Sequence, residues 1–421
     1  MAAKTLIRGP ATSREQYSAL DMVISRNGAK AVKLTVRGSE PIEAKLGEWS
    51  VWVPLKFKIE FRELCGQIKF MLLELEPHLR LYGSAIHLDP SAQAYPFTCP
   101  DCFGAELVNK IGAFHTLGMS EQSGPLLDKR YDFPVFLSEC QAITGERRKI
   151  LDLELNRFDG GLLACVLDTS DRLQHAFWAS RDPLHPAHAS QKAYVQVIPG
   201  MYREMDDILG EVLAKIDSRT ALLVLSDHGF NSFRRAAHLN RWLIENGYMH
   251  LKETNAKDGQ QLFLDVDWSR TQAYALGFCG IYLNLKGREG QGVVEPEGQR
   301  KLLEELAAKL REWKDTVSGA PIIHQVYFGT ELYHGPATPE GPDLVLGLKP
   351  GFRVSWQTAT GGAPLPLVVD NVDLGSGDHL IDPTFVPGVP SATRPLRSRR
   401  RACWISPPLF CAAWDSTPPR T

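Results

Sequence analysis

The stretch Thr220-Ala-Leu-Leu-Val-Leu-Ser-Asp-His-Gly229 joins a short apolar run to an acidic residue and a histidine. Such a run is typical of a strand that is buried on both faces. Adjacent strand residues point to opposite faces, so Asp227 and His228 converge only if the chain has turned, and Gly229 permits that turn without steric cost. α/β sheets bind ligands at the carboxyl ends of their strands. Packing does not explain Asp-His-Gly at such a position, so the stretch predicts a functional site.

The sequence on either side of this stretch alternates between strand and helix patterns. Residues 161–167 (Gly-Leu-Leu-Ala-Cys-Val-Leu) predict a second buried strand, and helical spacing occurs over about 136–158, 190–216 and 241–248. Further strands are expected within 271–285 and 343–348, with a helix at about 298–313 between them. This rhythm predicts an α/β fold whose mostly parallel sheet is flanked by helices and joined by right-handed crossovers.

The two ends of the chain differ from this middle part. Residues 50–61 alternate apolar and polar side chains, which predicts a strand, and 69–75 predict another, so residues 1–130 are predicted to be a β-rich, cap-like segment. Residues 131–390 are predicted to form the metal-binding α/β core. Residues 391–421 mix basic, proline and tryptophan residues without a period, which indicates a disordered or frame-shifted tail. A basic tail that binds an acidic partner is the other interpretation.

Two further sites pair aspartate with histidine. Asp171 and His175 follow the predicted strand at 161–167, and on a helix their i, i+4 spacing places both side chains on one face, within reach of one metal ion. Alone, a helix cap and a surface histidine would explain this pair equally well. The third site is Gly375-Ser-Gly-Asp-His379, a glycine-rich loop late in the sequence that contains His379.

Together these places supply five nitrogen and oxygen ligands and no thiolate: Asp171, His175, Asp227, His228 and His379. Ligands of this type suit Zn²⁺ or Mn²⁺. Two such ions about 4 Å apart form the clamp that assists in-line displacement at phosphorus. The sequence therefore predicts a centre of two divalent metal ions that acts on a small phosphorylated substrate.

Composition excludes several other classes of partner. The 421 residues are 43% hydrophobic and 23% charged, with a formal net charge of -2, which gives no electrostatic footprint for nucleic acid or for a membrane surface. No apolar run approaches the roughly 18 residues that span a bilayer, and no signal peptide is recognisable, so a cytoplasmic location is expected. The oligomeric state is not indicated. Of the eight cysteines only Cys99 and Cys102 form a C-x-x-C pair, which is either redox-active, half of a zinc site, or simply two thiols in a loop.

Some weaker candidates remain. His185 and His188 lie in a proline-rich segment and are either additional ligands or surface residues. Four further residues could line a substrate pocket: Arg353, Trp356, Gly361 and Gly362. For Trp356, packing in the core is the other explanation.

The Asp/His motifs resemble those of the type I phosphodiesterase/nucleotide pyrophosphatase branch of the alkaline phosphatase superfamily, especially its bacterial phosphohydrolase/phosphomutase-like members. The similarity covers roughly residues 45–398. The resemblance implies an alkaline phosphatase-like core, with Asp171, His175 and His379 at one metal ion and Asp227 and His228 at the other. Accompanying stretches are also similar: Gln174-His-Ala-Phe-Trp178, His238-Leu-Asn-Arg-Trp242, Asp267-Trp-Ser-Arg-Thr-Gln-Ala-Tyr274 and Ile281-Tyr-Leu-Asn-Leu-Lys-Gly-Arg-Glu289.

The chain departs from the family pattern at both ends. The family's second metal also needs an aspartate from the first strand of the core, and its Thr or Ser nucleophile lies shortly after that strand. Neither is found here, so the resemblance predicts a truncated chain that begins within the inserted cap and could retain one of the two ions. After Ser398 the family usually continues into a helix, whereas this tail is unpatterned.

Four functional hypotheses follow. The first is a metal-dependent phosphoric ester hydrolase whose parent uses a Thr or Ser nucleophile and a phosphoenzyme intermediate. A phosphomutase would share the metal site and differ only in the acceptor. A third hypothesis is a catalytically inactive metal-binding fragment, because the two-metal clamp would be incomplete. A purely structural metal site is the fourth, and carboxylate-rich ligands argue against it.

Overall fold

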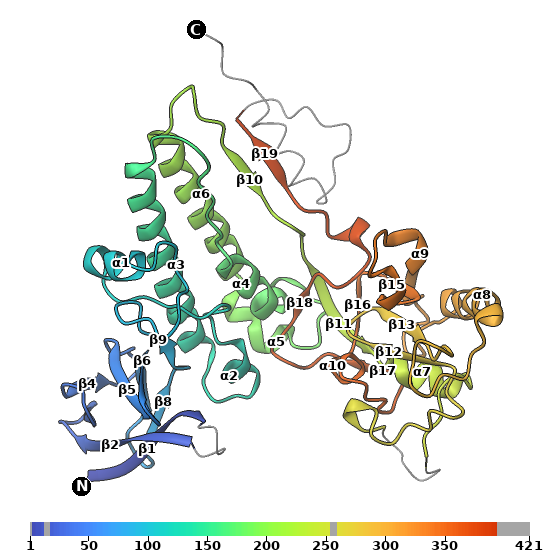
Figure 1. The fold of residues 1–421 in the computed structure, drawn as a ribbon, viewed down its shortest axis with the longest axis horizontal. Helices are drawn as coiled ribbons and strands as arrows, with labels where there is room; N and C mark the ends of the chain where they lie inside the picture. Colours follow the sequence, from blue (N-terminus) through green and yellow to red (C-terminus); the bar gives the residue numbers. More distant parts are fainter. Residues whose placement is uncertain (1, 12–16, 253–258, 394–421) are drawn as a thin grey trace. The chain divides into compact units, whose positions relative to one another are not determined.

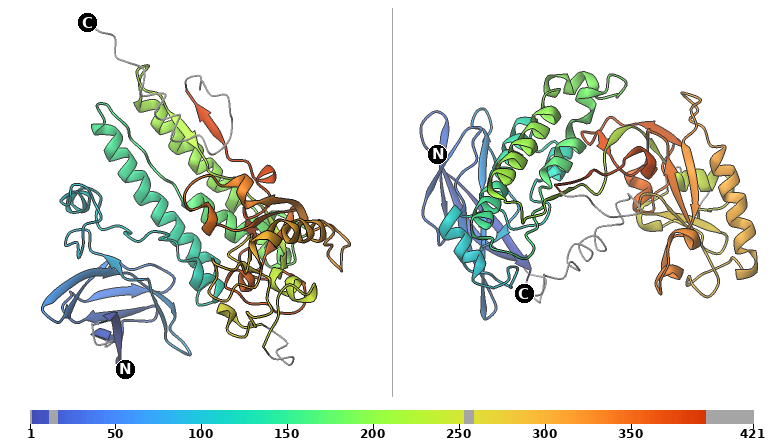
Figure 2. Two further views of the ribbon diagram at one scale, coloured as in Figure 1. Left: turned by 45° about the vertical axis from the view of Figure 1, so that its right-hand side comes forward. Right: turned by 90° about the horizontal axis from the view of Figure 1, so that it is seen from above.

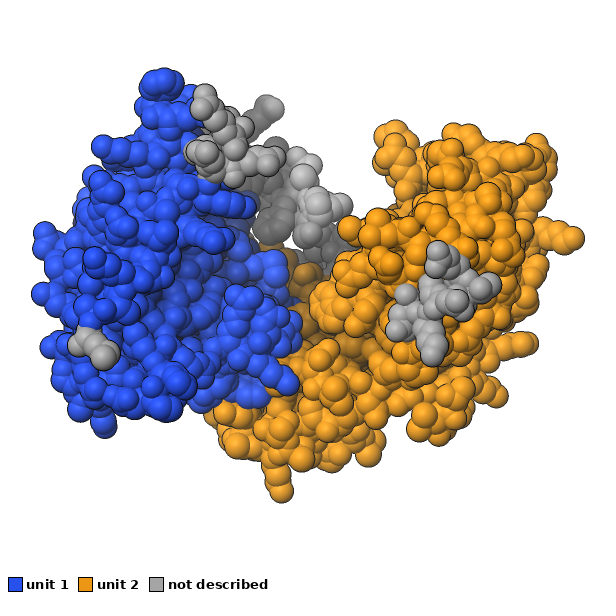
Figure 3. All heavy atoms as spheres, turned by 90° about the horizontal axis from the view of Figure 1, so that it is seen from below, with its two compact units in different colours: residues 1–172, 204–215 blue, residues 173–203, 216–421 orange. Residues whose placement is uncertain are grey.

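The computed structural model describes residues 2–11, 17–252 and 259–393 (Figure 1). The predicted tail therefore lies outside the described residues from position 394 onward. The chain forms two compact units, of which unit 1 comprises residues 1–172 and 204–215, and unit 2 comprises residues 173–203 and 216–421 (Figure 3). The boundaries fall inside two helices, α4 (Thr169–Phe177) between residues 172 and 173, and α6 (Val197–Lys215) between residues 203 and 204.

Unit 1 begins with a β-rich region that lies within the predicted cap-like segment. Alternation of apolar and polar residues builds the core of this region. In its third strand Val32, Leu34 and Val36 are buried, while Lys33 and Thr35 are exposed. All strand pairs of this unit are antiparallel. One sheet contains β1 (Ala2–Ala11), β2 (Tyr17–Arg26), β3 (Ala31–Val36) and β4 (Ile42–Lys45); a second contains β5 (Val53–Ile59), β6 (Arg62–Ile68) and β9 (His87–Leu88); a third contains β7 (Phe70–Glu74) and β8 (Arg80–Gly83).

The helices of unit 1 follow the strands: α1 (Phe103–Ile111), α2 (Ser123–Leu127) and α3 (Phe133–Arg157). Helix α3 starts at Asp132, whose side chain accepts a hydrogen bond from the Val135 N–H. It runs beside the second half of α6 (Val197–Lys215), as both views of Figure 2 show. Ion pairs from Arg148 to Glu211 and from Lys215 to Asp152 join the two helices.

Unit 2 contains the antiparallel sheet that forms its main core. The strand order is β12 (Ala273–Leu276), β13 (Gly280–Leu283), β15 (Leu344–Leu348) and β14 (Ile323–Phe328). Helix α8 (Gln299–Arg311) packs on the same hydrophobic core through Leu303, Leu306 and Leu310, which recur at helical spacing. Other short elements are α5 (His188–Gln191), α7 (Leu239–Glu245), α9 (Gly329–Leu332) and α10 (Trp356–Ala359).

A second sheet of unit 2 is organised around β11 (Asn231–Ala237). β16 (Gly351–Val354) pairs with β11 in parallel, whereas β17 (Val368–Asp370) and β18 (Gly377–Asp378) pair with it antiparallel. A separate two-stranded ladder joins β10 (Leu223–Leu225) to β19 (Pro390–Ala392). This arrangement brings residues 375–379 beside the start of β11, just after the Asp-His-Gly stretch.

The prediction of a mixed α/β fold is confirmed in part, but the predicted mostly parallel sheet is not found in the part of the chain that the structure describes. Between named strands of that part, only β11 and β16 pair in parallel. The turns between neighbouring strands explain the difference. Residues 277–279 join β12 to β13, and such a connection is far too short for the crossover that parallel pairing needs.

The predicted buried strand at 161–167 is wrong for these described residues. The segment belongs to no strand, and Leu162 and Val166 are 59% and 75% exposed. An apolar run becomes a buried strand only if neighbouring strands accept its backbone hydrogen bonds, and no described strand pairs with this one. The run at 220–225 does contain a strand, since Leu223–Leu225 form β10, although Val224 and Leu225 are exposed.

No helix within the described ranges has the length and apolar character that a membrane crossing requires.

Two buried titratable side chains lie in unit 1 among polar neighbours. The His87 ring accepts a hydrogen bond from the Thr116 N–H at its Nδ1 (3.0 Å), and burial, with His115 and Lys69 adding to it, lowers the His87 pKa from 6.5 to about 3. Burial also raises the Glu139 pKa from 4.5 to about 7. The two groups therefore respond to pH in opposite directions.

We expect His87 and Glu139 to make opposing contributions to stability between pH 7 and pH 5. Stability from neutral His87 is present above pH 6.5 and is lost as pH falls toward 3, because only the unfolded chain takes up the proton. Glu139 favours folding below pH 4.5 and penalises it as pH rises through 7, because the unfolded chain ionises first. Each trend amounts to about 2 kcal/mol across this interval.

Urea unfolding at pH 7 and pH 5 measures these trends. Relative to the unmodified chain, the stability of His87→Gln should increase on acidification, and that of Glu139→Gln should decrease. A His87→Gln chain with the same pH dependence as the unmodified chain would contradict the assignment of a neutral buried imidazole.

Candidate metal centre

Helix α4 carries the first two ligand candidates. Asp171 lies in its first turn and His175 in its last turn, one helical turn apart, as the i, i+4 spacing requires. Asp171 also forms an ion pair with the neighbouring Arg172 (2.5 Å). The carboxylate is thus held on the helix beside a cation.

The glycine-rich loop meets this helix through its backbone. The Ser376 N–H donates to the His175 carbonyl (2.7 Å), and the Gly377 carbonyl lies 2.7 Å from His175 Nδ1. A Cβ atom at position 377 would lie 2.4 Å from the Gln174 carbonyl oxygen and 2.8 Å from Trp178 Cβ. Only glycine allows this approach, so the residue type at 377 determines how close the loop comes to α4.

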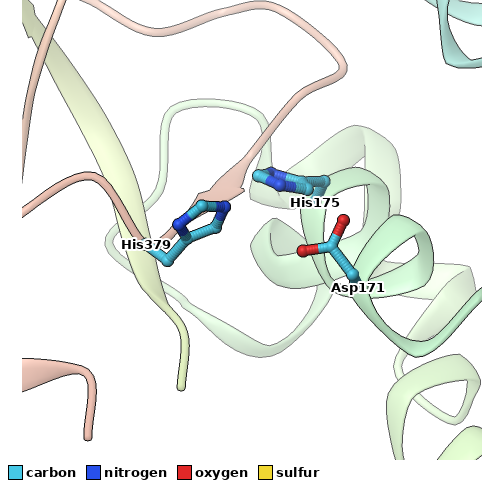
Figure 4. Close-up of side chains that lie close together, drawn as sticks. All are labelled: Asp171, His175 and His379. Atoms are coloured by element: carbon cyan, nitrogen blue, oxygen red, sulfur yellow. The ribbon is translucent and has the colours of Figure 1, made fainter. Parts of the chain in front are cut away.

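The result is a cluster of three ligands. Asp171, His175 and His379 each offer one ligand atom, and these atoms all lie within 4.8 Å of one another. Their side chains converge from α4 and from the residue after β18 (Figure 4). All three are partly buried, which limits competition from water.

The hydrogen bonds of the histidines fit metal ligation. A carbonyl oxygen accepts, so His175 Nδ1 carries the proton and the lone pair lies on Nε2. His228 has the same arrangement, because its Nδ1 donates to the Gly229 carbonyl at 3.0 Å. A ligating histidine usually donates its other N–H to such an oxygen, which orients the ring. One carboxylate and two imidazoles form a donor set that suits Zn²⁺ or Mn²⁺.

The other predicted pair, Asp227 and His228, follows β10. The His228 ring stacks on the His379 ring, with centroids 3.5 Å apart and planes 12° apart. The Asp227 side chain is 88% exposed, and its Oδ2 lies 3.6 Å from His228 Nε2. The structure therefore brings His228 to the edge of the three-ligand cluster and leaves the Asp227 carboxylate facing solvent.

The weaker candidates have structural partners. His185 is buried, with Nε2 2.7 Å from the Phe233 carbonyl and Nδ1 accepting from the Ala187 N–H. His188 Nδ1 lies 2.7 Å from the Ala179 carbonyl. Cys99 and Cys102 are exposed free thiols just before α1. Neither histidine nor either thiol belongs to the three-ligand cluster.

The sequence interpretation missed how the loop is supported. Asp378, the neighbour of His379, is buried and forms an ion pair with the buried Arg353 (2.7 Å between Nε and Oδ2). Trp356 covers Arg353 and lines a cavity of about 210 Å³ together with Phe233 and Leu365. An aspartate directly before a ligand histidine was visible in the sequence, but its partner lies 25 residues upstream and carries no local signal.

Comparison with known proteins gives one family. The family model for type I phosphodiesterase / nucleotide pyrophosphatase matches residues 127–361, more than half of the chain. The matched part contains Asp171, His175, Asp227 and His228, whereas His379 lies beyond it. No curated protein and no solved structure matches the chain.

We expect Gly377→Ala to weaken metal binding as well as stability. The added methyl group must displace the loop or α4, at a cost of about 1–3 kcal/mol, and the displacement moves the carbonyl that orients His175. Urea unfolding and Zn²⁺ titration measure the two effects. Gly145→Ala, in α3 with no atom near the added methyl, is the control: it should keep the Zn²⁺ affinity, and its stability should rise by about 0.5–1 kcal/mol because alanine favours the helix. Unchanged Zn²⁺ affinity in Gly377→Ala would argue against this role.

We also expect Zn²⁺ to bind through Asp171, His175 and His379. Replacing His175 by Ala or Asp171 by Asn removes a ligand, so the dissociation constant should rise by at least about tenfold. Competition with a chromogenic chelator measures it. The exposed His334 lies outside the cluster, and His334→Ala should leave the affinity unchanged. Equal affinity in all four chains would place the metal elsewhere.

Proposed function

Because the chain belongs to the type I phosphodiesterase / nucleotide pyrophosphatase family, we propose that it is a metal-dependent phosphoric ester hydrolase of small phosphorylated substrates. The observation that carries the proposal is the convergence of Asp171, His175 and His379 within 4.8 Å. Family membership supports phosphoester hydrolysis in general. The convergent ligands add the dependence on a divalent ion, for which Zn²⁺ and Mn²⁺ are the candidates.

The proposed roles follow from the positions of the side chains. Asp171 would supply the negative charge that a divalent cation needs, and His175 and His379 would supply neutral nitrogen ligands. A bound ion would polarise a phosphoryl oxygen and stabilise negative charge that develops on it. The carbonyl of Gly377 orients the His175 ring, so this ligand would be preorganised for the ion.

We propose Asp227 and His228 as ligands of a second ion. The stacking of His228 on His379 supports this proposal, because it places the two rings side by side at the site. The Asp227 carboxylate is exposed, so an ion can approach it from solvent. A second ion held by these two residues would supply further stabilisation of negative charge at the phosphoryl group.

The second candidate function is metal binding without hydrolysis. It is favoured by the ligand geometry, because within the described ranges one cluster of three ligands occurs, and no group of three lies around Asp227. We assign no Thr or Ser nucleophile. A phosphomutase remains the related alternative, since it would use the same metal ligands and a different acceptor.

Hydrolysis of p-nitrophenyl phosphate and of bis-p-nitrophenyl phosphate, with Zn²⁺ or Mn²⁺ added, tests the proposal. We expect metal-dependent release of p-nitrophenol, with kcat/KM reduced on the order of 100-fold in His175→Ala and in His228→Ala, since each change removes a ligand. His334→Ala is the control and should retain full activity. The two substrates separate monoester from diester preference.

The outcomes discriminate between the candidates. Activity that requires metal and is lost in both ligand variants supports the hydrolase. Metal binding that depends on His175, without turnover of either ester, supports the non-hydrolytic alternative. Hydrolysis that persists in His175→Ala would contradict the proposed centre.

A further inference from the structure

Arg353 is a buried cation in the sheet next to the metal centre. It lies on β16, opposite Ala236 of β11, and is only 1% exposed. Its guanidinium carbon is 4.0 Å from the Trp356 ring centroid and 4.4 Å from that of Phe278, so aromatic faces replace most of its water. Such burial excludes direct contact with a substrate in this conformation. Its function must therefore be exerted through a neighbour.

The neighbour is Asp378, one residue before His379. Arg353 Nε lies 2.7 Å from Asp378 Oδ2, and the Asp378 side chain is 5% exposed. Burial lowers the pKa of the guanidinium, and the carboxylate partly offsets that effect. A buried ion pair adds little net stability, because desolvation of both charges opposes their attraction. Its presence here is better explained by the geometry that it imposes.

The second oxygen of Asp378 defines that geometry. Oδ1 accepts hydrogen bonds from the N–H groups of His379 (2.8 Å) and Leu380 (2.9 Å). One carboxylate therefore holds the backbone on both sides of the His379 Cα, while its other oxygen forms the ion pair with Arg353, at a short distance but without the alignment of a hydrogen bond. On the preceding residue, the Gly377 carbonyl holds the His175 ring. The chain from 377 to 380 is thus tied to β16 and to α4.

We propose that Arg353 is a positioning residue for the ligand His379, acting through Asp378. The proposal rests on the proposed function insofar as it takes Asp171, His175 and His379 as the metal ligands. Without Arg353, the Asp378 carboxylate loses its fixed partner and rotates toward water. Its two backbone hydrogen bonds then weaken, and the His379 ring samples orientations that do not face Asp171 and His175.

The chain offers a matched control. Arg235, on β11, is also largely buried and forms ion pairs with Asp315 (2.7 Å) and Asp370 (2.6 Å), and both of these partners lie outside residues 377–380. Arg353→Met and Arg235→Met each remove one charge and keep an unbranched side chain. Both should destabilise the fold. Only the former should affect the metal ligand.

The first measurement is Zn²⁺ affinity of the full chain by chelator competition. We expect the dissociation constant to rise about tenfold in Arg353→Met, and to change much less in Arg235→Met. In a His379→Ala background, adding Arg353→Met should cause no further loss, because its effect passes through that ligand. Arg353→Lys retains the charge without the planar fork, so it should recover part of the affinity.

The second measurement needs no metal. In the metal-free chain labelled with [¹³Cε1]histidine, the His379 imidazole signal, assigned with His379→Ala, should shift or broaden in Arg353→Met and stay unchanged in Arg235→Met. The signal of His185, which is held by its own hydrogen bonds, serves as an internal reference. If Arg353→Met does not fold, Arg353→Lys carries the same comparison, with a smaller expected change.

The two measurements separate the failure of this inference from that of the proposed function. If the unmodified chain binds no Zn²⁺, the proposed function fails, and the imidazole signal alone decides the role of Arg353. Equal Zn²⁺ affinity in the two methionine variants, or an unperturbed His379 signal in Arg353→Met, would overturn the inference. A loss that persists undiminished in the His379→Ala background would likewise reduce Arg353 to a structural role.

Discussion

The candidate centre depends on one short contact, the 2.7 Å approach of His175 Nδ1 to the Gly377 carbonyl. It joins a helix to a strand ladder about 200 residues away in sequence, and it selects the imidazole tautomer whose Nε2 faces the other ligands. The contact is possible only because position 377 has no side chain, since the carbonyl oxygen of Gln174 would occupy the space of a Cβ. Ligand orientation therefore follows from backbone packing.

Around this contact the centre is supported at two levels. Helix α4 fixes the relative positions of Asp171 and His175, and the loop after β18 delivers His379. Behind the loop, the Arg353–Asp378 pair supplies a rigid acceptor for the backbone N–H groups. The buried Arg353–Asp378 ion pair thus holds the neutral ligand His379 in place. The geometry of the centre therefore depends on three elements: α4, the loop after β18, and β16, which carries Arg353.

The sequence predicted the elements with strong local signals. The i, i+4 spacing of Asp171 and His175 and the helical pattern of α3 and α8 are local properties, and the structure has these helices. It did not predict strand pairing, because pairing depends on partners far along the chain. The apolar run at 161–167 has a strand composition but no described partner. Conversely, β2 and β3 alternate buried and exposed residues before residue 50, where no individual strand was expected. Arg353 could be named as a candidate from the sequence, but its ion pair with Asp378 could not be predicted.

The exposed segment at 161–167 has a consequence for the chain as a polypeptide in a cell. Proteases bind substrates as extended strands and read side chains such as leucine and valine, and this segment presents Leu162 and Val166 on a backbone without strand pairing. Cleavage there would sever the β-rich region from helix α4 a few residues before its first ligand. Cleavage at this segment would therefore require no unfolding of either hydrophobic core.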